Sequence, residues 1–136
     1  MKKVSLVILI ASIFLISSCT GSPYTDEQLS SFATCLADKD VKEYGAFWCP
    51  NCAKQAKLFG DAEDVLKSRG VYIECDPRCS VPEDDLPRAC RGVVGRTDLC
   101  LMNNIQGYPT WDLPDDVRIT GVTQLEDLAR MSGCTL

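Results

Sequence analysis

The chain has 136 residues, enough for one modest domain but not for two. Its hydrophobic content of 46% and charged content of 24% are ordinary for a globular protein and give no sign of disorder or of a repeat array. The net charge is −5, and the unusual features are nine cysteines and the absence of histidine. Such a cysteine density is typical of disulfide-forming compartments and would be unusual in a reducing cytosol.

The N-terminus has the pattern of a secretory signal peptide. Lys2 and Lys3 form a positive start, and Val4–Ile16 is an apolar run that is too short for a comfortable membrane-spanning helix. The next residues, Ile16–Cys19, comprise an aliphatic residue, two small residues and a cysteine. This tetrapeptide resembles the lipobox of bacterial lipoproteins, in which the cysteine thiol is lipidated and the signal is cleaved just before it.

Lipidation at Cys19 would account for the odd number of cysteines, because it leaves eight that can pair. We therefore expect residues 1–18 to be a lipoprotein-type signal peptide, residues 19–24 to be the lipid anchor and its tether, and residues 25–136 to form the domain. The alternative is an ordinary secretory signal cleaved nearby, which would leave Cys19 free. Cleavage removes two of the 14 basic residues and none of the 19 acidic ones, so we expect no nucleic-acid partner.

The hydrophobic pattern and the turn residues divide the rest of the chain into helices and strands. We predict, in chain order, a helix over 25–38, a strand over 41–47, a helix over 50–68 interrupted at Gly60, a strand over 71–74, a short helix over 97–104, strands over 108–113 and 117–120, and a closing helix over 123–131. Thr25 with Gln28, and Thr123 with Glu126, are predicted capping boxes. The stretch 76–95 holds three prolines and two cysteines and is predicted to be a surface insertion. The order indicates an α/β domain around a small mixed sheet.

A C-x-x-C motif stands at the predicted start of the second helix, where Pro50 is well tolerated. Unpaired backbone N–H groups and the helix dipole favour the thiolate form of the first cysteine, Cys49. We therefore expect Cys49 to be the exposed, attacking sulfur and Cys52 to be the more enclosed, resolving sulfur. A C-x-x-C alone is a weak signal, since zinc sites and structural disulfides share it. Because histidine is absent, a zinc site would need further cysteines, and we expect no bound metal and no cofactor.

Several segments resemble one family in the same chain order. Tyr44–Cys52 looks like the active-site segment of thioredoxin-like proteins. The closest match is the thioredoxin-like domain that is fused to, or accompanies, bacterial homologues of vitamin K epoxide reductase. The further matching segments are Lys57–Gly60, Ile73–Asp76, Gly107–Trp111, Thr120–Gly121 and Leu125–Gly133. The resemblance implies a thioredoxin-like α/β fold, with a small mixed β-sheet flanked by helices and a cysteine-containing loop insertion.

The resemblance also implies roles for residues outside the C-x-x-C. Pro109 matches the cis-proline that faces the cysteine pair, and the alternative is an ordinary trans-proline in an edge strand. Glu43 matches the buried acid that helps to move the proton of the resolving cysteine, and the alternative is an outward-facing strand glutamate. One departure is Asn51, where the group usually has histidine, so we expect a less oxidising couple than in the histidine-bearing relatives.

The six remaining cysteines allow 15 pairings. The resemblance implies one structural bridge between the second strand and the following helix; a second pair brackets the insertion, and the last two cysteines remain to tie the chain ends together. The expected pairs are Cys75–Cys100, Cys79–Cys90 and Cys35–Cys134. The alternative is that one pair relays electrons to Cys49 and Cys52.

These observations predict an extracytoplasmic thiol–disulfide oxidoreductase that acts on protein thiols or disulfides through Cys49 and Cys52. We expect a monomer, anchored by its lipid to a membrane in the periplasm or on the outer cell surface, with a membrane redox partner resembling vitamin K epoxide reductase. The direction of electron flow stays open. Two alternatives are a non-enzymatic thioredoxin-like scaffold lipoprotein and a copper metallochaperone that uses the same cysteines.

Overall fold

The computed structural model describes residues 22–93 and 95–136, so the predicted signal peptide and the candidate lipidation site Cys19 lie outside the described residues. Its helices and strands are α1 (Asp26–Asp38), β1 (Lys42–Gly45), α2 (Pro50–Phe59), α3 (Glu63–Ser68), β2 (Tyr72–Glu74), α4 (Thr97–Met102), β3 (Thr110–Leu113), β4 (Val117–Thr120) and α5 (Leu125–Ser132). Within the described residues, no helix combines the length and the apolar character needed to cross a membrane.

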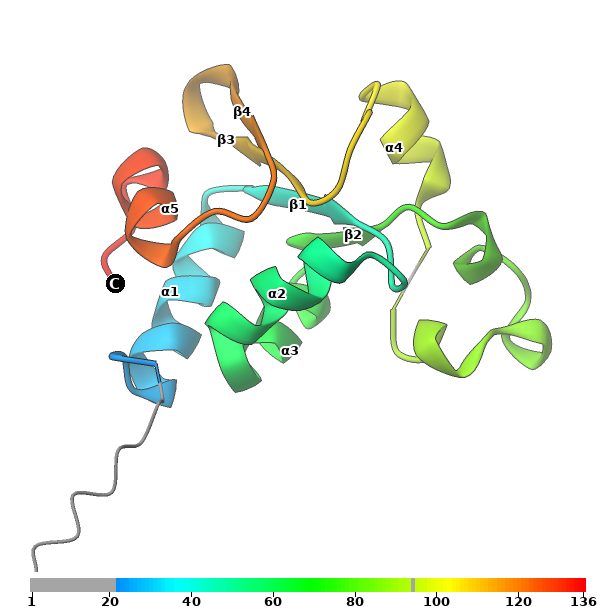
Figure 1. The fold of residues 1–136 in the computed structure, drawn as a ribbon, viewed down its shortest axis with the longest axis horizontal. Coiled ribbons are helices and arrows are strands. Elements are labelled where there is room, and N and C mark those ends of the chain that lie inside the picture. Colours follow the sequence, from blue (N-terminus) through cyan, green and yellow to red (C-terminus); the bar gives the residue numbers. More distant parts are fainter. Residues whose placement is uncertain (1–21, 94) are drawn as a thin grey trace, which may run out of the picture.

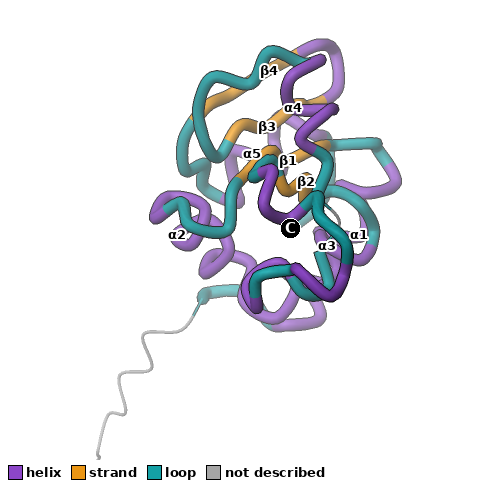
Figure 2. The backbone as a smooth tube through the Cα atoms, turned by 90° about the vertical axis from the view of Figure 1, so that its right-hand side faces the viewer, coloured by secondary structure: helices purple, strands orange, loops and turns teal. Residues whose placement is uncertain are grey.

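The four strands form one mixed sheet in the order β2-β1-β3-β4. Strand β1 is parallel to β2 and antiparallel to β3, and β3 and β4 form an antiparallel hairpin. In Figure 1, α2 and α3 lie below the strands and α4 lies above them. The turned view of Figure 2 shows the strands following one another in the order of the sheet, with the helices around them.

Two separate groups of buried side chains cover the two faces of the sheet, because successive strand residues point to opposite sides. The larger core joins α1, α2, α3 and α5 to β3, with the ring of Phe59 between Phe32 and Trp111 at centroid distances of 5.9 and 6.1 Å. The smaller core lies under α4 and contains Tyr44 and Ile73. The described domain is therefore a sheet with helices on both faces.

The first capping box is confirmed and the second is wrong. The Thr25 side chain accepts the backbone N–H of Gln28, whose own side chain accepts the backbone N–H of Thr25. Helix α5 instead begins after Gln124, with no side-chain cap. The reason is that Thr123 is buried and its backbone N–H and carbonyl both bond to the side-chain amide of Gln55 on α2.

The strand ends differ from the predicted bounds where the chain turns toward the cysteine pair. Strand β1 ends at Gly45, because Ala46 already accepts the backbone N–H of Cys49 in a turn. Strand β3 begins at Thr110, since Pro109 has no N–H to offer a neighbouring strand. The predicted interruption near Gly60 is a short 3₁₀ turn, at which Gly60 has a φ of 54°.

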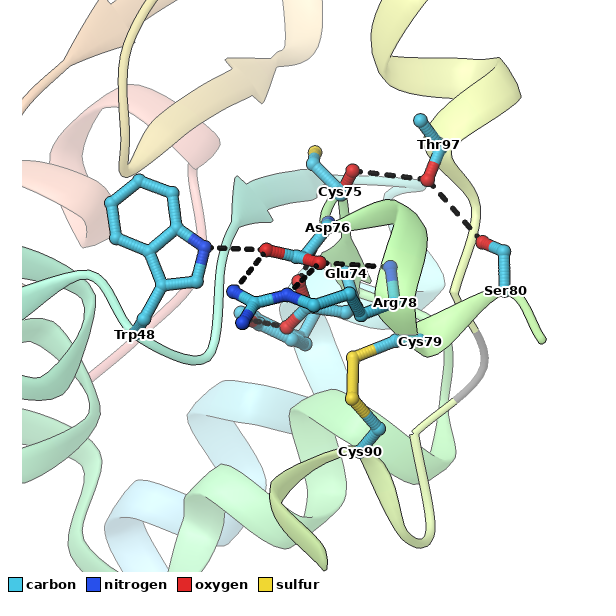
Figure 3. The surroundings of a disulfide bond; sticks show 10 residues. Trp48, Glu74, Cys75, Asp76, Arg78, Cys79, Ser80, Cys90 and Thr97 are labelled. Carbon is cyan, nitrogen blue, oxygen red and sulfur yellow. Dashed lines mark hydrogen bonds and ion pairs between the residues drawn. A yellow bond between two sulfur atoms is a disulfide. The ribbon is translucent and has the colours of Figure 1, made fainter. Parts of the chain in front are cut away.

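Three disulfides join distant parts of the domain, and they are the three pairs expected above. Their S–S distances are 2.10 Å for Cys35–Cys134, 1.97 Å for Cys75–Cys100 and 2.00 Å for Cys79–Cys90. The first ties α1 to the second residue after the end of α5, and the second ties α4 to the residue that follows β2. The third closes the insertion, which is a series of short 3₁₀ turns, and is drawn in Figure 3.

Candidate active site

Cys49 and Cys52 lie at the N-terminus of α2, and they are the two free cysteines among the described residues. Cys49 is the N-cap residue, so its sulfur accepts the backbone N–H of Cys52 at 3.3 Å. Pro50 occupies the first turn of the helix, where its missing N–H costs no helical hydrogen bond. The local sequence therefore builds a helix end that directs a free backbone donor at the first sulfur, which favours its thiolate.

The expected difference in exposure between the two cysteines is not present. Cys49 is 6% exposed and Cys52 is 7% exposed, so Cys49 is as enclosed as its partner. The reason is the loop before β3, because Tyr108 packs against the pair and its carbonyl oxygen lies 3.7 Å from the Cys49 sulfur. A residue that is 59 positions away in the chain thus covers the first cysteine, which a local pattern does not reveal.

The loop over Cys49 also carries Pro109, and the Tyr108–Pro109 peptide bond is cis. Its position is held from both sides: the Pro109 carbonyl accepts the N–H of Gly121 at 2.7 Å, and the Gly107 carbonyl accepts the hydroxyl of Thr110 at 2.8 Å. The structure therefore places the predicted proline loop directly against the cysteine pair.

Cys52 lies against a half-open pocket of about 470 Å³ that residues of β1, α2, α3 and β2 line. Burial raises the pKa of Cys52 above its ordinary range, and the adjacent Cys49 sulfur raises it further. The insertion lines part of the same cavity through Ala89 and Val93. The resolving cysteine therefore needs a group that takes up its proton before it can react as a thiolate.

Glu43 is buried on β1 and lines the same cavity as Cys52, so the alternative of an outward-facing glutamate is wrong. The pKa of Glu43 is raised to about 8, chiefly by burial and also by the nearby Glu63, while Lys67 opposes the rise. A carboxyl with this pKa exchanges protons close to neutral pH, which is a property of acid–base groups.

Figure 3 shows a polar cluster that the sequence pattern does not reveal, in which Asp76 and Arg78 hold the indole of Trp48. The Trp48 indole N–H donates to Asp76 at 2.6 Å, and the same carboxylate accepts two bonds from the Arg78 guanidinium. The Arg78 guanidinium holds the pKa of Asp76 down at about 2. Arg78 in turn lies 4.8 Å above the ring of Phe47. The cluster fixes an indole that is 55% exposed and packs edge-on against Tyr108.

The described residues contain no group of three or more histidine, cysteine, aspartate or glutamate side chains placed to hold a metal ion. The site as the structure shows it therefore consists of two thiols, a cis-proline loop, a buried acid and an anchored tryptophan.

No protein-family model matches the chain. The chain is 32% identical over 119 residues to the thiol-disulfide oxidoreductase LTO1 of Arabidopsis thaliana, and the alignment covers 88% of this chain and 27% of that protein. The chain thus spans about a quarter of the length of this relative. With the mixed four-stranded sheet and the helices on both its faces, this similarity decides the fold class. The fold is thioredoxin-like. The insertion with its own disulfide, Cys79–Cys90, is an addition to the small sheet of this thioredoxin-like fold.

Proposed function

We propose that the protein is an extracytoplasmic thiol–disulfide oxidoreductase that acts on protein thiols or disulfides through Cys49 and Cys52. The observation that carries this proposal is the division of the cysteines. Six of the eight in the described residues form bridges, and the two that remain free share the N-terminus of one helix. The similarity to a thiol-disulfide oxidoreductase supports the same chemistry.

In the reducing direction, the Cys49 thiolate attacks a substrate disulfide, forms a mixed disulfide and expels one substrate thiolate. Cys52 then loses its proton and attacks the Cys49 sulfur. The Cys49–Cys52 disulfide forms, the bond to the substrate breaks, and the second substrate thiolate leaves. The substrate gains two electrons and the cysteine pair loses two. The oxidising direction is the reverse, and Glu43 exchanges a proton with Cys52 in both.

Substrate would bind over the loop that covers Cys49. The Tyr108 carbonyl next to the sulfur is a backbone group that an extended substrate segment can pair with, as in strand addition at a sheet edge. The exposed face of Trp48 lies beside it and offers apolar contact area of the kind common at binding surfaces. These contacts recognise backbone and general apolar surface rather than one sequence.

The location and the partner extend the proposal beyond the described residues. We propose a lipid anchor on Cys19, a position in the periplasm or on the outer cell surface, and a membrane redox partner resembling vitamin K epoxide reductase. A quinone-linked partner of that type would make the protein an oxidase, whereas a membrane electron donor would make it a reductase. Labelling with a radioactive fatty acid in a bacterial host, compared with a Cys19→Ser variant, tests the anchor.

The redox proposal is tested by equilibrating the purified protein with glutathione redox buffers, trapping free thiols with an alkylating reagent and reading the products by mass. We expect two thiols to interconvert with one disulfide at Cys49 and Cys52, and Cys52→Ser to accumulate a mixed disulfide on Cys49. The matched control, Cys35→Ser with Cys134→Ser, should keep the exchange. Inert cysteines would support the scaffold alternative, and stoichiometric copper without exchange would support the metallochaperone.

The residue between the two cysteines, Asn51, influences the direction in which electrons flow. Replacing Asn51 by histidine places a group next to the pair that can carry positive charge and stabilise a thiolate. In the same glutathione buffers, the Asn51→His variant should be reduced at a more oxidising ratio than the wild type, with a shift of several-fold in the equilibrium constant. An unchanged equilibrium would remove Asn51 as the reason for a less oxidising couple.

A further inference from the structure

A second buried carboxyl group lies on the Cys52 side of the sheet. Glu74, the last residue of β2, is 1% exposed. The register of the parallel strands pairs Tyr72 with Glu43 and Glu74 with Gly45, so these residues belong to the same face of the sheet. The residues that line the shared cavity include Glu43, Cys52, Tyr72 and Glu74. Two buried acids, rather than one, therefore border the cavity of the resolving cysteine.

Glu74 is held by donors on both of its oxygens. One oxygen accepts the backbone N–H of Asp76 at 2.8 Å, and the other accepts the hydroxyl of Tyr72 at 2.9 Å. Burial raises the pKa of Glu74 overall, although these two hydrogen bonds to its charged form oppose the rise. Glu74 thus differs from Glu43, for which the structure records no hydrogen bond from a neighbouring side chain and whose pKa rises to about 8.

The hydroxyl of Tyr72 connects Glu74 to Cys52 because Gly45 leaves space between them. A Cβ atom placed on Gly45 would lie 3.1 Å from the Tyr72 hydroxyl oxygen and 3.1 Å from the Cys52 sulfur. The two atoms therefore border the same small space and lie at most about 6 Å apart, a separation that one water can bridge. The pocket is half open and has polar groups on its wall, so water can enter it.

The division of labour between the two acids follows from their surroundings. Because the pKa of Glu43 is about 8, only about a tenth of the molecules carry an ionised Glu43 at pH 7. Glu43 is then well suited to give a proton to Cys52 when the disulfide opens, but it is a scarce acceptor when Cys52 must be deprotonated. Glu74 is a second acceptor that the geometry offers, because two donors hold its carboxylate and one of them, the Tyr72 hydroxyl, lies on the Cys52 side.

The other charged groups around Cys52 do not replace Glu74 as an acceptor of its proton. Those that line the cavity or act on Glu74 and Tyr72 are Glu43 on β1, Cys52 and Lys57 on α2, Glu63 and Lys67 on α3, and Asp76 and Arg78 after β2. Lys67 is paired with Glu63 at 2.6 Å, and Arg78 is paired with Asp76 at 2.9 Å. The cations with a recorded partner are thus already neutralised, and the carboxylates remain the proton acceptors.

We propose that Tyr72 and Glu74 form a second proton route for Cys52, beside Glu43. The inference rests on the proposed function. The Cys52 proton passes to the Tyr72 oxygen, directly or through one cavity water, while the Tyr72 hydroxyl proton passes to Glu74. The Cys52 thiolate then attacks the Cys49 sulfur, the Cys49–Cys52 disulfide forms and the substrate leaves as a thiolate. Glu74 gains one proton, Tyr72 keeps the number it had, and the electron pair of the broken bond leaves with the substrate.

The test separates the two chemical steps. The protein, with Cys49 and Cys52 reduced and its three bridges intact, is mixed with oxidised glutathione and quenched with acid at intervals. Mass then distinguishes the glutathione adduct on Cys49 from the Cys49–Cys52 disulfide. The variants are Tyr72→Phe, which keeps the ring beside Gly45, and Glu74→Gln, which keeps the size of the side chain. The adduct should form at the wild-type rate and resolve at least tenfold more slowly near pH 6.5.

The pH profile and a double variant distinguish a proton route from a structural role. In both variants the remaining resolution rate should rise with pH through about 8, as Glu43 becomes the available acceptor. Because both residues act in one route, the double variant should be no slower than the slower single variant. The matched control is the exposed pair of Tyr24 and Glu126, whose hydroxyl–carboxylate distance is 2.6 Å. Tyr24→Phe and Glu126→Gln should leave both steps unchanged.

Three results would overturn the inference: wild-type resolution in Tyr72→Phe, an unchanged pH profile in both variants, or effects that add in the double variant. If Glu74→Gln fails to fold, as judged by circular dichroism, Tyr72→Phe alone decides the matter. If the wild-type protein forms no adduct and no Cys49–Cys52 disulfide, the proposed function fails instead, and the two failures are therefore distinguishable.

Discussion

Glu43→Gln is a substitution whose effect on stability follows directly from the structure. Burial raises the pKa of Glu43 from 4.5 to about 8. Between these pH values the folded protein binds more protons than the unfolded chain, so its free energy of unfolding falls as the pH rises. Each unit of pKa difference corresponds to about 1.4 kcal/mol, which gives a loss of about 4 kcal/mol by pH 8. Glutamine does not titrate, so the variant should escape this loss.

The measurement is urea unfolding at pH 4.5 and pH 8, with Cys49→Ser and Cys52→Ser in both proteins so that no thiol of the pair titrates. The free energy of unfolding of the Glu43→Gln protein, relative to its parent, should rise by about 4 kcal/mol between the two pH values. Glu83→Gln, at an exposed position in the insertion, is the matched control and should show no such rise. A pH-independent difference would mean that Glu43 is not buried in its acid form.

Three further predictions concern the rest of the domain. Replacing Cys35 and Cys134 by serine opens a bridge with a sequence separation of 99 and should lower the free energy of unfolding by about 4 kcal/mol; a loss below about 1 kcal/mol would contradict its role as a clamp. Thr25→Ala removes the confirmed capping box and should cost about 1 kcal/mol in the same assay, whereas no change would show that the box contributes nothing. Asp76→Ala frees the indole of Trp48, so its fluorescence anisotropy should fall while the far-ultraviolet circular dichroism stays the same; equal anisotropy would show that other contacts hold the ring.

Much of the fold was predictable because its signals are local. The apolar spacing, the turn residues and the Thr25 capping box act within a few positions, and the helices and strands appear in the predicted order. The failed capping box shows the limit of such signals. Thr123 has the right residue type and spacing, but the Gln55 side chain, 68 positions away, occupies its backbone groups.

Local sequence patterns predicted the site only in the part that one segment carries, and Pro109 and Glu43 were predicted from the family resemblance instead. The motif at Cys49 and Cys52 contains both sulfurs and the helix start, whereas the cover over Cys49 comes from Tyr108 in a distant loop. The neighbourhood of Tyr72 and Cys52 depends on the register of β1 against β2 and on the missing side chain of Gly45. A shift of that register by one residue would turn Tyr72 to the other face, and no local pattern specifies it.

The disulfides and the buried acids have opposite effects on the stability of the domain. Burying Glu43 and Glu74 opposes folding whenever either is ionised, and for Glu43 alone the cost reaches about 5 kcal/mol well above pH 8. Apolar residues at both positions would remove that cost but would also remove both buried carboxyl groups from the pocket beside Cys52. The three disulfides contribute about 2–4 kcal/mol each and so offset the cost, and none of their cysteines is among the residues that line the pocket. Opening the Cys35–Cys134 bridge should therefore lower stability while the glutathione exchange of the folded protein stays intact, because neither Cys35 nor Cys134 lines the pocket beside Cys52.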